Sequence, residues 1–262
     1  MVRGTAGFIV TALVMGGGLR APAQDSFVGV RGRAWWADPG GEMKFTSSPP
    51  EATTIHPAGD LGISSPRVFY NITGYVNLGS TWRISADYLR GSYHGSATAG
   101  RPLVFDKSAF PAGAEVHSAL DVQRFELFID ETIYPMSNGG GIYSSLGFIW
   151  ADIGAQMSGA GTSSSDSVNG IFPILGFHAD VPIFGGLRGI GRVSYTQLKI
   201  GNKSLHTYEL EGGLGFFFGN HFAAEGGYRL WRCDLFNDAG SFRDREVDMT
   251  FVGPFVGLNL LF

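Results

Sequence analysis

In the last seven residues of the chain, every second side chain is a large apolar one. The apolar positions share one face of an extended strand, because successive side chains of a strand point to opposite faces. They are Val256, Leu258, Leu260 and Phe262. An unpaired strand edge with such an apolar face would promote aggregation in water. The pattern therefore predicts a strand that faces lipid and has both edges paired in a closed barrel.

The segment from Gly253 to Phe262 resembles the closing strand of bacterial outer-membrane β-barrel proteins, of the small OmpA and opacity-porin type. In that class, a terminal aromatic residue after alternating apolar residues is read by the barrel-assembly machinery. The resemblance implies that Val256, Leu258, Leu260 and Phe262 form an assembly signal. It also implies two partners, the assembly machinery and outer-membrane lipid, and a location in the outer membrane.

The first residues have the pattern of an export signal. Arg3 supplies a positive charge, an apolar stretch runs from Phe8 to Leu19, and Ala21-Pro22-Ala23 gives a small-x-small cleavage pattern. The stretch is shorter than the ~20 residues of a membrane-spanning helix. We therefore expect residues 1–23 to be a signal peptide and residues 24–262 to form one outer-membrane β-barrel domain.

Composition narrows the class further. Glycine accounts for 40 of 262 residues, and 44% of residues are hydrophobic while 16% are charged. Such apolar content argues against disorder, and polar residues interrupt every apolar run after residue 23. Membrane insertion would thus require a closed barrel, because backbone groups in lipid need internal partners. Without residues 1–23, acidic residues outnumber basic ones, so we expect no nucleic-acid partner.

Strand-like segments and their connections predict an all-β, closed, antiparallel, up-and-down transmembrane barrel of about ten strands, with eight or twelve as alternatives. The segments are 26–37, 66–77, 81–91, 119–133, 142–155, 171–181, 187–200, 205–218, 222–234 and 246–262. Short links at 78–80, 134–141, 182–186 and 219–221 alternate with longer ones at 38–65, 92–118, 156–170 and 235–245; the link at 201–204 is a short exception. Outer-membrane barrels have short periplasmic turns and longer external loops.

The last strand contains a change of phase. Val247, Met249 and Phe251 share one parity, whereas the apolar residues from Val256 onward have the other. Gly253-Pro254 lies between them, and prolines in sheets occupy edges or bulges. We expect a β-bulge there; the alternative is that residues 247–251 lie above the membrane.

Charged residues at inward parity predict a network of ion pairs in the lumen. The members are Arg31, Arg33, Arg67, Arg83, Asp87, Arg124, Glu126, Asp130, Arg192, Glu209, Glu211, Glu225 and Arg229. Side chains fill the interior of a small barrel, and arginine binds carboxylates bidentately. The network predicts a plugged lumen and a structural or surface-interaction role. A narrow channel for ions or small solutes is the alternative.

Catalysis is the second alternative. His178 and Asp180 share a strand face and could act as a base and its orienting partner in an outer-membrane hydrolase. Ten-stranded proteases of the omptin type use Asp and His residues near the external rim, whereas these two lie at the periplasmic end of the expected barrel. We predict no catalytic, metal-binding or cofactor-binding residues and no cofactor. The loops 38–65 and 92–118 are expected to form a lid and are the candidate site for an extracellular ligand.

Overall fold

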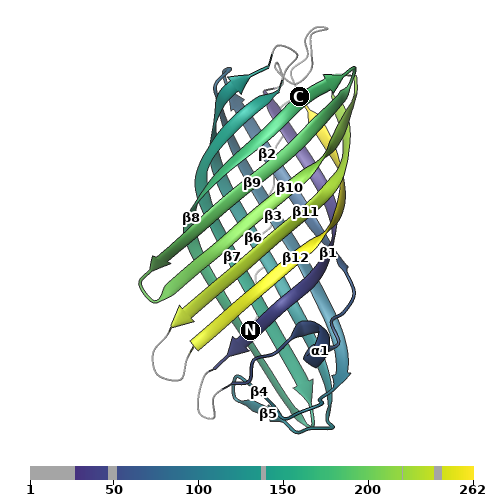
Figure 1. The fold of residues 1–262 in the computed structure, drawn as a ribbon, viewed down its shortest axis with the longest axis vertical. Coiled ribbons are helices and arrows are strands. Elements are labelled where there is room, and N and C mark those ends of the chain that lie inside the picture. Colours follow the sequence, from purple (N-terminus) through teal and green to yellow (C-terminus); the bar gives the residue numbers. More distant parts are fainter. Residues whose placement is uncertain (1–26, 47–51, 137–139, 220, 239–243) are drawn as a thin grey trace.

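The computed structural model describes residues 27–46, 52–136, 140–219, 221–238 and 244–262. The predicted signal peptide lies outside these residues. Ten antiparallel strands form a closed up-and-down barrel in the order β1-β12-β11-β10-β9-β8-β7-β6-β3-β2 (Figure 1). They are β1 (Val28–Phe45), β2 (Arg67–Leu78), β3 (Trp82–Thr98), β6 (Glu115–Pro135), β7 (Gly141–Gly159), β8 (Thr162–Phe184), β9 (Leu187–Ile200), β10 (Lys203–Phe218), β11 (Phe222–Asp238) and β12 (Asp244–Leu261). The predicted fold class and strand number are confirmed.

The two ends of the barrel differ. Short links, 79–81 and 185–186 among them, lie at what we call the turn end, where β12 also finishes. The backbone of Phe262 exchanges hydrogen bonds with Val28 there, at 2.9 and 3.2 Å, so the last residue pairs with the first strand. The opposite end, the loop end, carries the long connections after β1 and β3.

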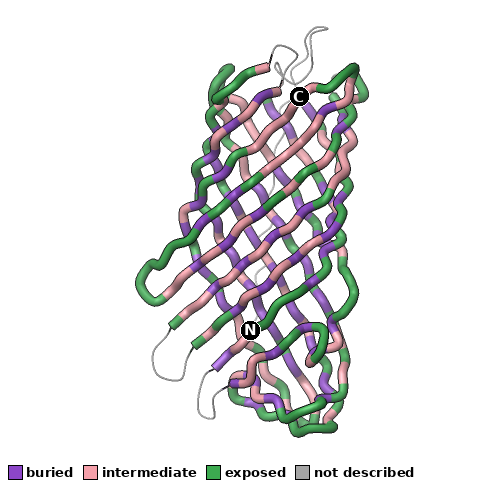
Figure 2. Tube along the Cα trace, viewed as in Figure 1, coloured by how far each residue is buried: buried purple, intermediate pink, exposed green. Residues whose placement is uncertain are grey.

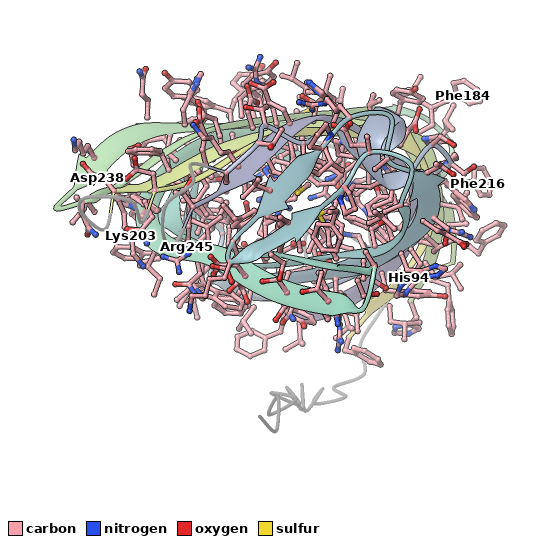
Figure 3. All side chains as sticks on the ribbon, turned by 90° about the horizontal axis from the view of Figure 1, so that it is seen from below. His94, Phe184, Lys203, Phe216, Asp238 and Arg245 are labelled. Carbon is pink, nitrogen blue, oxygen red and sulfur yellow. The ribbon has the colours of Figure 1, made fainter. Side chains whose placement is uncertain are left out.

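The loop end is covered by three short elements, which lie across the mouth of the barrel in Figures 1 and 3. They are α1 (Pro57–Leu61), β4 (Leu103–Phe105) and β5 (Ser108–Phe110). Leu61, Phe105 and Phe110 are fully buried. Because these side chains point into the barrel, the short elements form a lid on its interior. Among the described residues, no helix is long and apolar enough to span a membrane.

The strands run further toward the loop end than the sequence pattern indicated. The loops expected at 38–65 and 92–118 are too long, because β1 continues to Phe45, β3 continues to Thr98 and β6 begins at Glu115. The loop expected at 156–170 is a hairpin that turns at 160–161. Most of these extensions carry apolar residues inward and polar residues outward, which is the reverse of a lipid-facing strand; in β8 the inward residues Ser164 and Asp166 are polar and bind Asp106 and Arg245.

The barrel consists of two halves with opposite polarity, and buried and exposed residues alternate along its strands (Figure 2). The turn half has a lipid-facing band of exposed large apolar side chains: Ile72, Ile84, Leu127, Ile129, Leu146, Phe148, Leu175, Phe177, Leu210, Leu214, Phe216, Val256 and Leu258. The loop half has an apolar core inside, which includes Trp35, Phe69, Tyr93, Leu120, Ile153, Phe172, Trp231, Met249 and Phe251. Polar residues cover most of its outside.

The predicted β-bulge at Gly253-Pro254 is wrong. The pairing of β12 with β11 keeps one register from Asp244 to Leu260. Its pairing with β1 is interrupted only opposite Gly253-Pro254 and resumes in the same register, because Pro254 has no N–H to donate. Val247, Met249 and Phe251 are apolar because they point into the core of the loop half, where all are fully buried.

Candidate functional site

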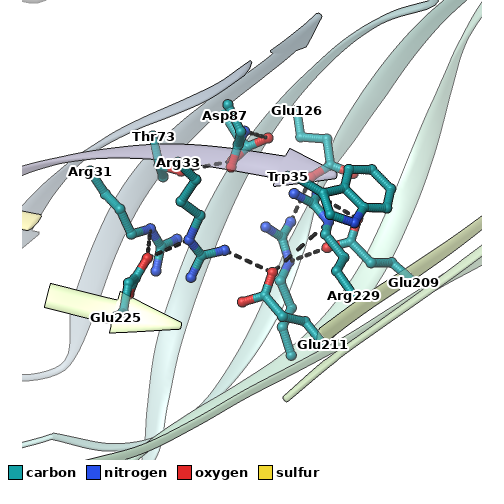
Figure 4. Close-up of polar contacts among 12 residues, drawn as sticks. Arg31, Arg33, Trp35, Thr73, Asp87, Glu126, Glu209, Glu211, Glu225 and Arg229 are labelled. Atoms are coloured by element: carbon teal, nitrogen blue, oxygen red, sulfur yellow. Dashed lines mark hydrogen bonds and ion pairs between the residues drawn. The ribbon is translucent and has the colours of Figure 1, made fainter. Parts of the chain in front are cut away.

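The lumen of the turn half holds one connected network of ten charged side chains, five arginines and five carboxylates. The arginines are Arg31, Arg33, Arg124, Arg192 and Arg229, and the carboxylates are Asp87, Glu126, Glu209, Glu211 and Glu225. We call this set the lumen network; most of it is drawn in Figure 4. Its formal charges cancel.

Alternation of side chains brings these residues together. Six strands, β1, β3, β6, β9, β10 and β11, each direct at least one member inward at a similar level of the barrel. The register places Asp87 opposite Glu126, and Glu211 opposite both Arg192 and Arg229. Glu209 and Glu211, two positions apart on β10, share Arg229, and each also reaches an arginine of its own, Arg124 for Glu209 and Arg33 for Glu211. The network therefore depends on the register of the whole barrel.

Arg33 and Arg124 are the best-connected cations. Arg33 donates to Glu211 at 2.7 Å and also to Glu225. Arg124 donates to Glu209 and lies 3.6 Å from both Asp87 and Glu126. Both guanidinium groups are almost entirely screened from solvent. These contacts distribute each positive charge over two or more carboxylates.

The remaining arginines complete the network. Arg192 donates to Glu126 at 2.6 Å, and Arg229 donates to Glu209 at 2.9 Å. Asp87 also accepts hydrogen bonds from Asn71 at 2.8 Å and Thr73 at 2.7 Å. An ionised carboxylate out of water needs several such partners, and Asp87 has them from two neighbouring strands.

Aromatic rings join the lumen network to the apolar core of the loop half. The guanidinium of Arg124 lies 4.8 Å from the ring centre of Trp231, and that of Arg229 lies 5.0 Å from Trp35. A cation over the face of a tryptophan is attracted by the ring quadrupole. Trp231 also donates to Thr207 at 2.9 Å, so its polar edge is satisfied. The boundary between charged and apolar interiors is thus made of arginine–aromatic contacts.

Three residues predicted for the network lie outside its ion pairs; Arg83 and Asp130 are still in the lumen, and Arg67 is not. Arg83 lies between the rings of Tyr75 and Tyr143, at 4.5 and 4.9 Å, and donates to Asn77 at 2.8 Å.

Asp130 is buried and accepts a hydrogen bond from Ser85 at 3.1 Å. Arg67 is exposed at the loop-end start of β2, so its assignment to the lumen is wrong. Alternation along the strand predicted that Arg67 points inward. However, β2 begins at this residue, so its side chain is at the rim of the barrel and exposed.

One lumenal ion pair was missed. Arg188 donates to Asp180 at 2.9 Å and lies over the ring of Phe217 at 4.8 Å. Arg188 has the same parity on β9 as Arg192, so the alternation that identified Arg192 would also have found it.

A cavity of about 120 Å³ lies between the network and the turn end. Polar side chains predominate around it, among them Arg31, Tyr75, Arg83, Asp130, His178 and Asp180. This is room for a few water molecules. The cavity does not extend through the buried layer formed by Arg124, Glu209 and Arg229, which are at most 1% exposed.

The two residues considered for catalysis bind other partners. The ring of His178 stacks on Tyr143 at 4.3 Å, and its Nδ1 lies 3.3 Å from the Ser145 hydroxyl. Asp180 pairs with Arg188. The imidazole and this carboxylate therefore do not form the expected base and orienting pair.

A second histidine has a serine and a carboxylate nearby. His117 Nδ1 lies 2.8 Å from the Ser96 hydroxyl, and its Nε2 lies 3.9 Å from Glu115, on the outside of the loop half. The side chains of His117 and Glu115 are 62% and 73% exposed. Water surrounds this trio, which lacks the desolvated setting of a catalytic site. The described residues also contain no group of three or more His, Cys, Asp or Glu placed to hold a metal ion.

Comparison with known proteins identifies the fold. No protein-family model and no curated protein sequence matches the chain. Among solved structures, the outer membrane protease OmpT from Escherichia coli superposes with a TM-score of 0.60 at 9% identity, over 91% of this chain and 97% of that one. This fold is an outer-membrane β-barrel.

Two other outer-membrane proteins are similar at lower scores. Ail of Yersinia pestis, solved with the heparin analogue sucrose octasulfate, has a TM-score of 0.38 at 10% identity, over 90% of this chain and 99% of Ail. The transport unit of the autotransporter AIDA-I from Escherichia coli has a TM-score of 0.42 at 7% identity, over 91% of each chain. The resemblance found in the closing strand is confirmed for the fold. The signal peptide and the assembly signal remain predictions.

Proposed function

We propose that this chain is a non-enzymatic outer-membrane protein whose lumen is plugged and whose loop half projects outside the cell as an interaction surface. The observation that carries the proposal is the filling of the interior. Charged side chains close the lumen of the turn half above a cavity of about 120 Å³, and the apolar core fills the loop half. Ions crossing such a barrel would have to displace the buried layer of Arg124, Glu209 and Arg229 and then enter an apolar core.

The outer surface supports the proposed location. The lipid-facing band surrounds the turn half, and exposed aromatic residues lie near its short links: Trp82, Tyr134, Phe184, Phe218 and Phe222. Aromatic side chains of this kind sit at membrane–water interfaces. The proposed partners are accordingly outer-membrane lipid and, during biogenesis, the assembly machinery that would read Val256, Leu258, Leu260 and Phe262. An extracellular ligand would bind the loop half, including what remains of the loops at 38–65 and 92–118.

The arrangement of polar groups supports a non-enzymatic role. In the lumen, His178 is held by Tyr143 and Ser145, and Asp180 is held by Arg188. On the outside, His117 lies in open solvent. The Ser145 hydroxyl and the Asp130 carboxylate lie near the same ring atom of His178, Nδ1, at 3.3 and 4.0 Å, so they do not flank the imidazole as a nucleophile and an orienting acid would. His117 is not in a pocket that excludes water.

Two measurements on the full chain test the proposal. The folded protein should be recovered in the outer-membrane fraction with a heat-modifiable gel mobility. In planar lipid bilayers it should give no conductance steps after insertion, which protease protection of the strands verifies in the same samples. Regular conductance steps would contradict the plugged lumen, and recovery as a soluble periplasmic protein would contradict the location.

A further inference from the structure

The loop half of the wall has a gap beyond the start of β2, where Ile55 and α1 lie against β1 and β3. A second gap lies between β8 and β9. β8 pairs with β9 only from Leu175 to Phe184, although it pairs with β7 from Thr162 to Asp180. β9 likewise continues to Ile200, beyond its last pair with β8 at Tyr195. Residues 162–174 of β8 and 196–200 of β9 are therefore two strand edges without their expected partner. We call the space between them the β8–β9 notch.

Proline lies where the pairing stops. Pro173 stays opposite Phe148, and the β7–β8 register is not interrupted there. Its backbone nitrogen, which has no hydrogen to donate, therefore faces away from β7 and toward the notch. Successive residues of a strand direct their backbone groups to opposite sides. Ile171 and Asn169 therefore turn their backbone groups toward the notch, as Pro173 does. The carbonyl of Asn169 accepts a hydrogen bond from Lys203 Nζ at 2.8 Å, in agreement with this direction.

The loop half of β8 instead turns inward across the barrel. Arg245 of β12 binds Asp166 of β8 through two hydrogen bonds of 2.8 and 2.9 Å, and Phe172 is buried in the core. The tips of β9 and β10 project away from the barrel, with Lys203 at the outer end of the elongated section in Figure 3. The two strand edges diverge as a result.

This divergence uncovers an apolar surface. Leu198 and Ile200 have the inward parity of Ser194 and Thr196, which are buried, yet they are 39% and 52% exposed. Ile171 on the other edge has outward parity, so its side chain lies on the outer face of the wall with Leu175 and Phe177. Lys199, on the same tip, is also exposed. The notch thus combines strand edges that lack a partner strand, the apolar side chains of Leu198 and Ile200, and the positive charge of Lys199; side chains bind two backbone groups of the β8 edge, the N–H of Ser167 and the carbonyl of Asn169.

We propose that the β8–β9 notch binds an extended polypeptide strand of a partner protein, with apolar side chains at alternate positions and acidic side chains between them. Such a strand would pair with the edge at Ile171 or Lys199 and complete the wall. Its apolar side chains would cover Leu198 and Ile200, and its carboxylates would reach Lys199. The inference rests on the proposed surface-interaction role and assigns it a place and a class of partner.

The backbone groups distinguish a peptide from a lipid chain as occupant. An acyl chain would cover the apolar residues but would leave the N–H and C=O groups of the edges without partners, which is costly once water is excluded. A peptide strand offers donors and acceptors at the spacing of the edge.

The test uses the full chain, refolded in detergent micelles, and a synthetic peptide, acetyl-Thr-Val-Glu-Val-Thr-Val-Glu-Val-amide. In the free protein, the amides of Asn169, Ile171 and Lys199 should exchange with deuterium much faster than those in the β7–β8 pairing. Added peptide should slow their exchange at least tenfold. The same peptide with N-methylated valines, which cannot pair along that edge, is the matched control and should have no effect.

Variants locate the contact. Ile171→Pro removes a notch-facing N–H and should weaken peptide binding at least tenfold, whereas Ile171→Val, which keeps it, should change binding less than twofold. Leu198→Asp should weaken binding to a similar extent as Ile171→Pro. Slow exchange in the free protein, equal binding of the N-methylated peptide, or occupation of the notch by a second copy or by detergent chains would overturn the proposal. If the protein gives no conductance and does not bind the peptide, only the proposal for the notch is contradicted. If it conducts ions and binds the peptide, only the plugged lumen is contradicted.

Discussion

The two halves of this barrel place their apolar side chains on opposite faces of the wall. In the turn half, apolar side chains face outward and the lumen network holds the interior together through charge. In the loop half, polar side chains face outward and the interior is an apolar core around Phe69, Trp231 and Phe251. The strands are continuous through both halves. The difference shows that the surrounding solvent, lipid or water, decides which face of a strand carries the apolar residues.

The largest expected effect comes from placing a charge in the apolar core. Phe251 stacks on Trp231 at 5.2 Å and contacts Phe69 at 5.6 Å. Phe251→Arg should destabilise the barrel by at least about 5 kcal/mol, because an unpaired charge would be buried and an aromatic ring lost. Thr250→Arg, one position along and outward, should be tolerated. Heat-modifiable mobility after refolding measures both; a folded Phe251→Arg barrel would contradict the separate core.

The next effect concerns the lumen network. Arg124→Ala leaves Asp87, Glu126 and Glu209 short of a cation and should cost about 3–5 kcal/mol. The added substitution Glu209→Gln should recover part of this loss. Arg232, which pairs with Asp248 on the outside, is the control, and Arg232→Ala should cost at most about 1 kcal/mol. Urea unfolding in lipid vesicles measures these changes in unfolding free energy. Equal losses of stability for Arg124→Ala and Arg232→Ala would show that burial of the ion pairs does not determine their contribution.

A charge introduced on the outer face should lower the stability of the turn half far more than that of the loop half. Val256→Arg places a cation in the lipid-facing band, where 51% of Val256 is exposed, and should cost about 2–4 kcal/mol. Gln156→Arg, also outward but in the loop half, should cost almost nothing. The two variants can be compared in vesicles and in detergent. A large loss for Gln156→Arg would mean that the membrane extends further toward the loop end.

The smallest effect is a pH dependence in the loop half. Burial raises the pKa of Asp234, and the carboxylate of Asp248, which faces it across β11 and β12, raises this pKa further. An acid with a raised pKa destabilises the folded state once it ionises, so its cost appears as the pH rises through the folded pKa. Asp234→Asn should therefore be more stable than the original chain at pH 7, by less than about 1 kcal/mol because the group is partly exposed. The gain should vanish near pH 3; a gain that persists there would exclude ionisation as its cause.

Alternation predicted the turn half well and the loop half poorly. It gave all ten strands and most of the lumen network, because outward apolar and inward charged residues are distinct in the sequence. The same rule interpreted Val247, Met249 and Phe251 as a shifted register, and it interpreted the serines after Gly161 as a loop. Both segments are strands of the loop half, where the inward face and not the outward face carries the apolar residues. Alternation within β8 and β9 places Asp180 and Arg188 inward, but a pattern within one strand does not specify which residues pair across strands, as Arg188 does with Asp180 and Arg245 with Asp166.

The unequal pairing around the barrel has a mechanical consequence. The closing pairing of β1 with β12 extends from Gly29 to Phe45, whereas that of β8 with β9, on the far side of the ring, is confined to the turn half. Under tension applied across the loop end, the wall would part between β8 and β9, whereas α1 and the bridge between Met43 and Ile55 join β1 to β3 beyond the loop-end start of β2. The β1–β12 junction would hold, and the ring would open into one curved sheet with β8 and β9 at its two edges.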